Sequence, residues 1–271
     1  MRSRAPLALG LYGALQAVLF PLLLPVVAFH PRLAGALGQR LGRWRFRRAD
    51  RRPIWLHGAS AGDVVALAPI GRALAGAGRP LLVSAWTRSG HEMALGRDWG
   101  PDPAQVFRAP LDMSFAVRGV LTRVRPALVV LECLEMWPNL VSQCQRRGVP
   151  VAVVNGRLSP GSHHRYQRAR WLFGPCFEGL ALVSALTEAD AQRFISLGVR
   201  PQCVSVETSS KHAELPSYQP GSACSAGRKL VLGSVHAAEA GRLLPWVGRL
   251  LDEMRDLQVV VAPRYPHRSE G

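Results

Sequence analysis

The segment WLHGASAGDVVALAPIG, at residues 55–71, places a carboxylate directly after a loop of very small residues. The apolar run ending at His57 predicts a strand, and the apolar run after Asp63 predicts a helix. Gly58 and Gly62 leave the loop backbone bare, so another molecule can approach it closely. Two interpretations of Asp63 are open: it belongs to a ligand site, or it only offsets the positive end of the helix dipole.

The charge of the chain predicts an anionic partner. The 271 residues carry a formal net charge of +16, nearly all from arginine, since Lys211 and Lys229 are the only lysines. Aromatic residues make up 7%, and no zinc-finger, helix-turn-helix or RNA-recognition motif is present, which argues against nucleic acid. RNA binding through the arginine surface is the weaker alternative. The five cysteines lack metal-type spacing and predict free thiols in a reducing compartment, with no metal site.

Residues 7–29 are almost wholly apolar and long enough to cross a bilayer. A cleaved signal peptide is a rival interpretation because Arg2 and Arg4 precede this run, but no small-residue cleavage site follows it. Seven arginines between Arg40 and Arg52 predict that this end, and with it the rest of the chain, stays on the cytoplasmic side of the membrane. Residues 1–52 are therefore expected to form a membrane anchor, or a helix in the membrane interface, followed by a basic juxtamembrane segment. A buried pair of core helices is the alternative.

From residue 53 onward, short apolar segments alternate with helix-like ones. Strands are predicted at 54–58, 80–86, 127–134, 150–156, 179–185 and 203–207, with helices including 114–124, 137–148 and 187–198. Thr187 is expected to cap the last of these helices, with Asp190 at its third position and Gly198 at its end. This alternation predicts an α/β fold with a parallel sheet covered on both faces. Ligands of such sheets bind at the carboxyl ends of the strands, where the sequence places Asp63, residues 86–90, Glu135 and Asn155.

The pattern also predicts a domain boundary. Residues 53–212 are expected to form one complete Rossmann-like domain, and residues 213–227, rich in Pro, Gly and Ser, form a linker. Residues 228–271 contain a strand at 229–236, a helix at 239–255 and a strand at 257–266. One such unit of about 45 residues cannot bury a core of its own, so an incomplete second Rossmann-like domain is expected.

Eight motifs occur in one order: HGASAGDVVALAPIGRAL, SAWTRSG, APLDM, EMWPNL, VNGRLS, TEADAQRF, GSVHAAEA and PRYPHR. Together they resemble the 3-deoxy-D-manno-octulosonic acid (Kdo) transferases of lipopolysaccharide synthesis, over nearly the whole chain. The resemblance implies a GT-B fold of two Rossmann-like domains. It also implies transfer of Kdo from its cytidine monophosphate conjugate (CMP-Kdo) to a lipid A precursor (lipid IVA), with inversion and without a metal or other cofactor.

The resemblance implies three catalytic positions. The family motif resembles HAVSVGE, and its Glu, the proposed general base, falls on Asp63, which is one methylene shorter. The Lys of the GNLKFD motif, thought to stabilise charge in the transition state, matches Lys211. The family's ETELWPN motif reads CLEMWPN here, so its first Glu, a proposed catalytic helper, becomes Cys133. Glu132 lies one position away and is expected to face the opposite side of its strand.

Substrate contacts are expected in both domains. Ser60, Gly62 and Arg165 are predicted to bind the acceptor. The resemblance assigns donor binding to the GSVH and PRYP motifs, and within them to Ser234, His236, Pro263 and Arg264. The family continues into a Gly-rich region that completes its nucleotide site, and no such region occurs before residue 271. The expectation is a truncated donor domain and weak or absent activity. The alternative is a non-catalytic remnant that binds lipid A or the membrane surface.

Overall fold

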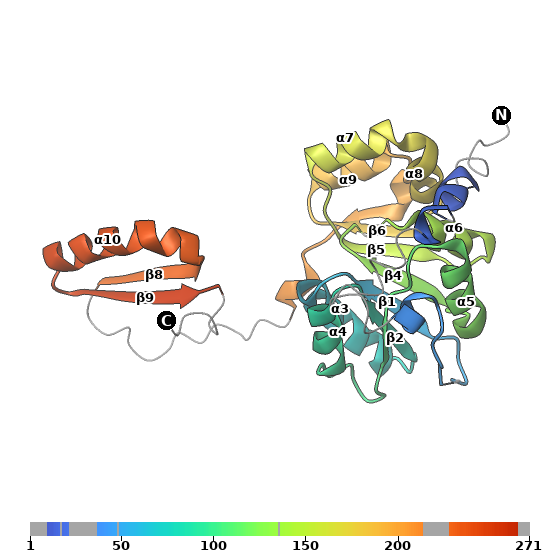
Figure 1. Cartoon of the computed structure of the whole chain (residues 1–271), viewed down its shortest axis with the longest axis horizontal. Coiled ribbons are helices and arrows are strands. Elements are labelled where there is room, and N and C mark those ends of the chain that lie inside the picture. Colours follow the sequence, from blue (N-terminus) through green and yellow to red (C-terminus); the bar gives the residue numbers. More distant parts are fainter. Residues whose placement is uncertain are drawn as a thin grey trace. The chain divides into compact units, whose positions relative to one another are not determined.

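The computed structural model describes residues 10–16, 18–21, 37–47, 49–134, 136–213 and 228–264. The chain divides into two units, Met1–Leu215 and Pro216–Gly271 (Figure 1). Most of the predicted linker, Glu135 and the residues after 264 lie outside the described residues.

The first unit is built on a parallel sheet with the strand order β3-β2-β1-β4-β5-β6-β7. The strands are β1 Ile54–Gly58, β2 Leu81–Ala85, β3 Gln105–Arg108, β4 Leu128–Glu132, β5 Val151–Gly156, β6 Leu182–Ala185 and β7 Val204–Val206. The α/β fold is confirmed, and every strand except β3 was predicted. The four residues of β3 are too few for a sequence pattern to identify them as a strand.

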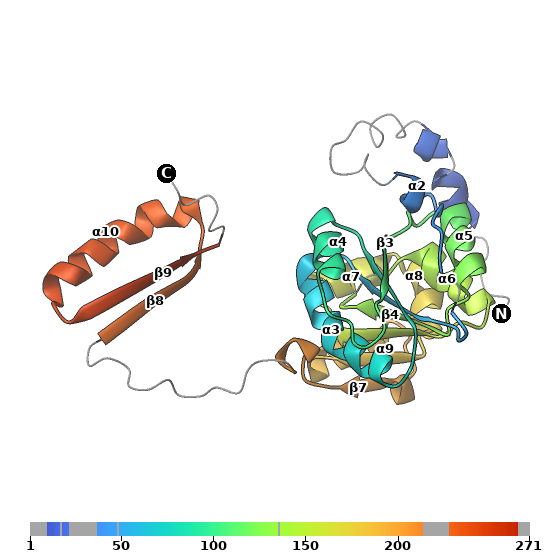
Figure 2. The same cartoon turned by 90° about the horizontal axis from the view of Figure 1, so that it is seen from below.

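Helices cover both faces of the sheet (Figures 1 and 2). One face packs against α3 Ala61–Gly76 and α4 Arg88–Leu95; the other packs against α5 Ser114–Val124, α6 Pro138–Arg146, α8 Arg170–Glu178 and α9 Glu188–Ser196. Neighbouring residues of β1 divide between the faces: Leu56 joins the core under α3, whereas Trp55 joins the core under α5. The shorter elements are α2 Leu37–Arg40, α7 Pro160–Arg168, and the 3-10 turns η2 Pro201–Cys203 and η3 Ser210–His212.

The strand order reverses its direction between β1 and β4. From β1 the chain proceeds outward through β2 to β3, and from β4 it proceeds the other way to β7. Loops that leave neighbouring strands at such a switch point separate and open a crevice at the carboxyl edge of the sheet. The loop after β1, the first turn of α3 with Asp63, and the end of β4 therefore flank the place where an α/β sheet binds its ligand.

The junction of β1 and α3 requires glycine at position 58. A Cβ at Gly58 would lie 2.9 Å from the Cβ of Asp63 and 3.2 Å from its carbonyl carbon. At Gly62 the nearest atom, Ser60 Oγ, would be 3.8 Å away. The close approach of the helix to the strand thus depends on the first glycine and not on the second.

We expect Gly58→Ala to lower the free energy of unfolding by about 1–3 kcal/mol, because the added methyl group must push α3 away from the strand. The matched control, Gly62→Ala, should stay within about 0.5 kcal/mol of the native protein. Guanidinium unfolding of the three proteins measures both values. Equal stability of the two variants would contradict this account of the junction.

Asp112 connects the N-terminal helical residues to the sheet domain. Its carboxylate accepts hydrogen bonds from the backbone N–H groups of Asn139 (3.0 Å) and Leu140 (2.8 Å), at the start of α6. It also accepts one from the hydroxyl of Tyr12, at 3.3 Å. Burial raises the pKa of Asp112 to about 7 even though these hydrogen bonds favour the ionised form.

This raised pKa predicts a pH-dependent stability. The native state binds more protons than the unfolded state between the ordinary Asp value of about 4 and the folded value of about 7. The contribution of Asp112 to stability is therefore complete below about pH 4 and is lost as the pH rises through about 7. Relative to Asp112→Asn, the unfolding free energy of the native protein should fall between about pH 5 and pH 8.

Chemical denaturation of the native protein and of Asp112→Asn, each at about pH 5 and about pH 8, measures the difference between their unfolding free energies. The comparison cancels the effect of His57, whose pKa burial lowers to about 4, because His57 is present in both proteins. A difference that stays constant with pH would show that Asp112 does not titrate in this range.

Residues 10–16 and 18–21 are helical. No helix within the described part of the chain is both long enough and apolar enough to span a membrane.

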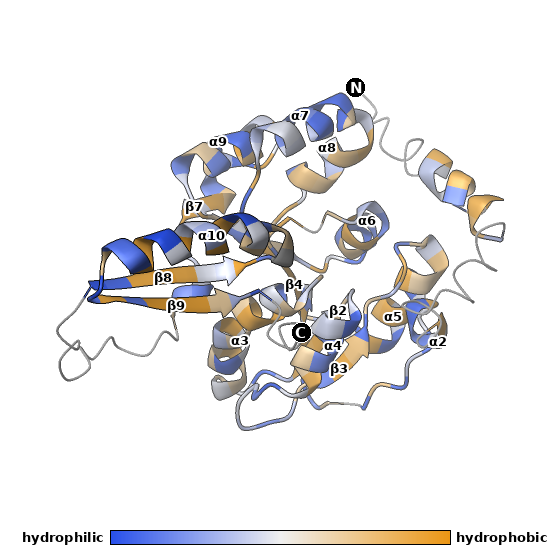
Figure 3. Ribbon diagram, turned by 60° about the vertical axis from the view of Figure 1, so that its left-hand side comes forward, coloured by the Kyte–Doolittle hydropathy of each residue, from blue (hydrophilic) through white to orange (hydrophobic). Residues whose placement is uncertain are grey.

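The second unit is a parallel βαβ unit, as predicted: β8 Arg228–Val235, α10 Ala237–Glu253 and β9 Leu257–Pro263. Figure 3 shows both strands as largely hydrophobic and α10 as a mixture of hydrophobic and hydrophilic residues. Val247 of α10 is buried, whereas Val231, Trp246 and Val260 are exposed.

Candidate active site

Asp63 lies in the first turn of α3, directly after β1. Its Oδ2 atom accepts hydrogen bonds from the backbone N–H and the hydroxyl of Ser60, both at 2.8 Å. Oδ1 makes no hydrogen bond with the described residues, and the side chain is partly exposed. One carboxylate oxygen therefore stabilises the helix start, as the dipole interpretation expects, and the other remains available to a ligand.

Glu132 and Lys211 form an ion pair at the end of β4. The Lys211 Nζ atom lies 3.8 Å from Glu132 Oε1, and the glutamate side chain is only 1% exposed while the lysine is 47% exposed. Asn155 Nδ2 donates to the same Oε1 at 3.4 Å. The lysine thus presents a positive charge at the surface and is held by a buried carboxylate.

Glu132 was expected to face the opposite side of its strand from position 133, and the structure pairs it with Lys211. Alternation of faces holds only within a strand, and β4 ends at Glu132. Cys133 follows in the left-handed region, with φ 59°, and turns the chain away. Burial is the main cause that raises the pKa of Cys133, and the charges of Glu132 and Asp63 raise it further. Glu132, one position from the residue aligned with the family's helper Glu, is the residue paired with Lys211.

Asn155 fixes the position of the turn that carries Lys211. The Ser210 N–H donates to Asn155 Oδ1 at 2.9 Å, and Asn155 Nδ2 donates to the Ser210 hydroxyl at 2.8 Å. That hydroxyl donates in turn to the Ala66 carbonyl of α3 at 2.6 Å. Lys211 is therefore attached to both β5 and α3, the helix that carries Asp63.

The predicted acceptor residues lie on two helices at the carboxyl edge of the sheet. Ser60 is the N-cap residue of α3, and Gly62 is exposed in the first turn of that helix. Arg165 is exposed on α7, which follows β5, and its guanidinium donates to the Ser162 hydroxyl at 2.8 Å. The side chain of Ser60 is thus committed to Asp63, whereas Arg165 faces solvent.

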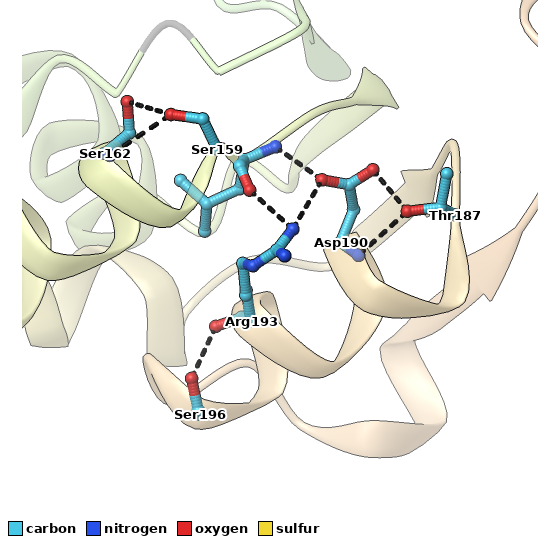
Figure 4. A network of polar contacts seen from close by, with 7 residues as sticks. Ser159, Ser162, Thr187, Asp190, Arg193 and Ser196 are labelled. Atoms are coloured by element: carbon cyan, nitrogen blue, oxygen red, sulfur yellow. Dashed lines mark hydrogen bonds and ion pairs between the residues drawn. The ribbon is translucent and has the colours of Figure 1, made fainter.

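A polar network fixes the start of α7 against α9 (Figure 4). Asp190 accepts hydrogen bonds from the Leu158 N–H at 2.9 Å and from the Thr187 hydroxyl at 2.6 Å. Arg193 donates to the Leu158 carbonyl at 3.0 Å. The Thr187 side chain also accepts from the Asp190 N–H, which confirms the predicted cap of α9. The network holds the loop that leads into the exposed basic helix.

The predicted donor residues come together in the second unit, at the carboxyl ends of its strands. Arg264 follows β9, donates to the Ser234 hydroxyl at 3.3 Å and bonds through its N–H to the Val235 carbonyl at 2.9 Å. His236 caps α10 and donates its N–H to Glu239 at 2.9 Å, and Pro263 ends β9. Across the described residues of the chain, no group of three His, Cys, Asp or Glu side chains is placed to hold a metal ion.

Comparison with solved structures identifies the fold. The chain aligns with a putative UDP-N-acetylglucosamine 2-epimerase from Listeria monocytogenes at a TM-score of 0.55 and 11% identity, covering 78% of this chain and 62% of that one. The UDP-GlcNAc 2-epimerase from Neisseria meningitidis also aligns at a TM-score of 0.55 and 11% identity, covering 77% and 64%. These neighbours share the GT-B-like α/β architecture.

Comparison of sequences identifies relatives named 3-deoxy-D-manno-octulosonic acid transferase. The protein from Chlamydia pneumoniae is 30% identical over 80% of this chain and 52% of its own length. The protein from Chlamydophila psittaci is 29% identical, over 98% of this chain and 64% of its own length. The protein from Haemophilus influenzae is 25% identical, over 95% of this chain and 63% of its own length. The chain thus spans about half to two thirds of the length of these curated relatives.

The family profile described as "3-Deoxy-D-manno-octulosonic-acid transferase (kdotransferase)" matches residues 35–213. This range contains the β1–α3 junction with Asp63, the end of β4 with Glu132, and Lys211. The chain belongs to the Kdo transferase family.

Proposed function

We propose that this protein is a glycosyltransferase that transfers Kdo from CMP-Kdo to a lipid A precursor. The observation that carries the proposal is the grouping at the switch point of the sheet: Glu132 pairs with Lys211, and the turn of Lys211 is bonded to α3, the helix that carries Asp63. The family match over residues 35–213 supports it.

In this proposal Asp63 is the general base. Its free Oδ1 takes the proton of the acceptor hydroxyl while the hydroxyl oxygen forms a bond to the anomeric carbon of Kdo. The bond from that carbon to the phosphate oxygen breaks at the same time, and CMP leaves with the electron pair. Attack opposite the leaving group inverts the anomeric centre. The two hydrogen bonds from Ser60 fix the orientation of the carboxylate, so the base is positioned before the substrate arrives.

Lys211 is proposed to stabilise the negative charge that develops on the departing phosphate. Glu132 touches no reacting atom in this scheme and is a positioning residue, since it holds the Lys211 ammonium from the buried side. In the second unit Arg264 is suited to a phosphate oxygen of the donor, close to Ser234, His236 and Pro263.

We further propose that the protein acts at the cytoplasmic face of the inner membrane. The N-terminal helical residues expose an apolar stripe at helical spacing: Leu11, Leu15, Val18 and Leu19. Phe115 of α5 is also exposed, and the centre of its ring lies 6.5 Å from that of the Phe20 ring. An apolar stripe of this kind suits a helix lying in the membrane interface, and the basic α7 suits anionic lipid.

Reversal of charge on α7 is expected to weaken binding to the membrane surface. The double variant Arg165→Glu, Arg168→Glu should bind vesicles containing anionic lipid more weakly than the native protein, by about 1 kcal/mol for each arginine near the surface. The difference should shrink in high salt. Vesicle co-sedimentation measures it, with Arg200→Glu as control, because exposed Arg200 precedes β7 at the opposite, amino-terminal edge of the sheet. Unchanged binding of the double variant would exclude α7 as the lipid-binding face.

The transferase proposal is tested by release of CMP from CMP-Kdo. We expect release to require the lipid A precursor and to continue in the presence of EDTA. Release that occurs equally without the acceptor would indicate hydrolysis and contradict the proposed transfer. Loss of release in EDTA would contradict metal-independent chemistry.

A further inference from the structure

Arg40 is a buried cation whose donors are only partly used. Its side chain lies over the ring of Trp86, with the guanidinium carbon 4.5 Å from the ring centroid, and the residue is 1% exposed. Nη2 donates to the Trp86 carbonyl at 2.8 Å, but Nε and Nη1 are buried and have no hydrogen-bond partner among the described residues. Buried polar atoms are nearly always paired, so two unpaired donors on one guanidinium require an explanation.

Two further basic side chains lie next to Arg40. Arg108 ends β3, and its backbone N–H donates to the side chain of Gln39, the neighbour of Arg40, at 2.9 Å. His91 of α4 has a buried Nδ1 atom that also lacks a hydrogen-bond partner among the described residues. Arg40, His91 and Arg108 therefore form one group, here called the basic cluster, at the carboxyl ends of β2 and β3.

The permanent charges of the basic cluster are those of Arg40 and Arg108, and no ion pair to either is seen within the described part of the chain. Burial is the main cause that lowers the pKa of Arg40 and of His91, and the charge of Arg108 lowers both further. Glu92 is the acid that acts on Arg108 and His91, and its carboxylate is engaged by Arg88 in an exposed ion pair at 2.6 Å. Like charges held together in a partly buried position are costly unless an anion joins them.

We propose that the basic cluster binds a phosphate monoester. The two free guanidinium donors of Arg40 and the guanidinium of Arg108 offer several charge-assisted hydrogen bonds to one doubly charged tetrahedral anion. The anion would also favour the protonated form of His91, whose Nδ1 could then donate. Such a ligand would satisfy the unpaired donors of Arg40 and offset the repulsion between Arg40 and Arg108.

The position of the cluster connects it to the active site. Arg40 bonds to the Trp86 carbonyl, and the backbone N–H groups of Trp86 and Thr87 both donate to the Ala59 carbonyl, at 3.2 and 2.8 Å. Ala59 belongs to the small-residue loop that precedes Asp63. The inference rests on the proposed function in one respect: the phosphate is assigned to the acceptor, so that its binding places the acceptor beside the Asp63 loop.

The experiment is isothermal titration of the full chain with inorganic phosphate and with glucose 1-phosphate, at constant ionic strength. The test variants are Arg108→Gln and His91→Gln. Arg40 is kept, because it is fully buried and its replacement is expected to destabilise the fold. Each should weaken the binding of both anions about tenfold, the loss expected for one charge-assisted hydrogen bond. Arg200→Gln, which removes an exposed arginine at the other edge of the sheet, should bind as the native protein does.

If Arg108→Gln binds the two anions with native affinity, the proposal is overturned. An equal loss of affinity in Arg200→Gln would also overturn it, because that result would indicate a general effect of net charge. Vesicles of zwitterionic lipid with phosphatidylglycerol distinguish the source of the phosphate. Arg108→Gln should bind them as the native protein does, and a loss confined to vesicles would assign the cluster to a lipid phosphodiester and overturn the proposal. The titrations contain no CMP-Kdo, so they test the phosphate site separately from the transfer reaction. If the protein binds phosphate but does not transfer Kdo in a separate assay, only the proposed function is contradicted.

Discussion

Asp63→Asn is expected to lower kcat for Kdo transfer by about 10²–10⁴-fold, the usual contribution of a positioned general base. Asparagine keeps a side-chain oxygen that can accept from the Ser60 N–H, so the start of α3 should form as before. The amide cannot take the proton of the acceptor hydroxyl. The variant therefore separates the two roles of this side chain, because it retains much of the helix contact and loses the base.

Initial rates with saturating CMP-Kdo and lipid A precursor measure the effect, and thermal unfolding measures the fold. Glu188→Gln is the matched control, since Glu188 is an exposed acid in the first turn of α9 and has no part in the proposed site. It should leave kcat unchanged. A kcat for Asp63→Asn within a few-fold of the native value would remove Asp63 from the role of base.

Lys211→Met is expected to lower kcat by about 10²–10³-fold, as loss of one group that stabilises transition-state charge does. Glu132→Gln should cost less, about tenfold, because Glu132 acts by holding the lysine. The double variant should be no slower than Lys211→Met alone, since a positioning residue contributes nothing once the group it positions is gone.

Stability gives an independent view of the same pair. Lys211→Met removes one cation from the buried Glu132 carboxylate and should destabilise the fold, by less than the 3–5 kcal/mol typical of fully buried pairs because Lys211 is half-exposed. The loss should be smaller in the Glu132→Gln background. Additive effects of the two substitutions on both kcat and unfolding free energy would contradict the pairing.

Local sequence predicted the features that depend on neighbouring residues. The alternation of apolar segments predicted the positions of most strands in the sequence, and the cap of Thr187 on α9 follows from a three-residue spacing. The small residues around Gly58 predicted a tight junction before Asp63, because the steric requirement lies within six positions of the chain. The notion that Asp63 stabilises the helix start was also correct for one of its two oxygens.

Features that depend on distant segments could not be predicted in the same way. The pairing of Glu132 with Lys211 joins residues 79 positions apart, and it depends on where β4 ends and on how Asn155 holds η3. The basic cluster joins Arg40, His91 and Arg108 from three separate elements, and the sequence shows these residues only as members of an arginine-rich chain. Side-chain alternation gives no direction for Cys133, because β4 ends at Glu132.

The most direct test of the account is the mass of the acceptor after incubation with purified protein and CMP-Kdo. The account predicts that the native chain adds Kdo to the lipid A precursor and that Asp63→Asn, folded to the same thermal stability, leaves the acceptor mass almost unchanged in the same time. Addition of Kdo at equal rates by both proteins would contradict the central claim that the carboxylate at the β1–α3 junction is the catalytic base. An unchanged acceptor with the native chain would contradict the proposed transferase activity itself.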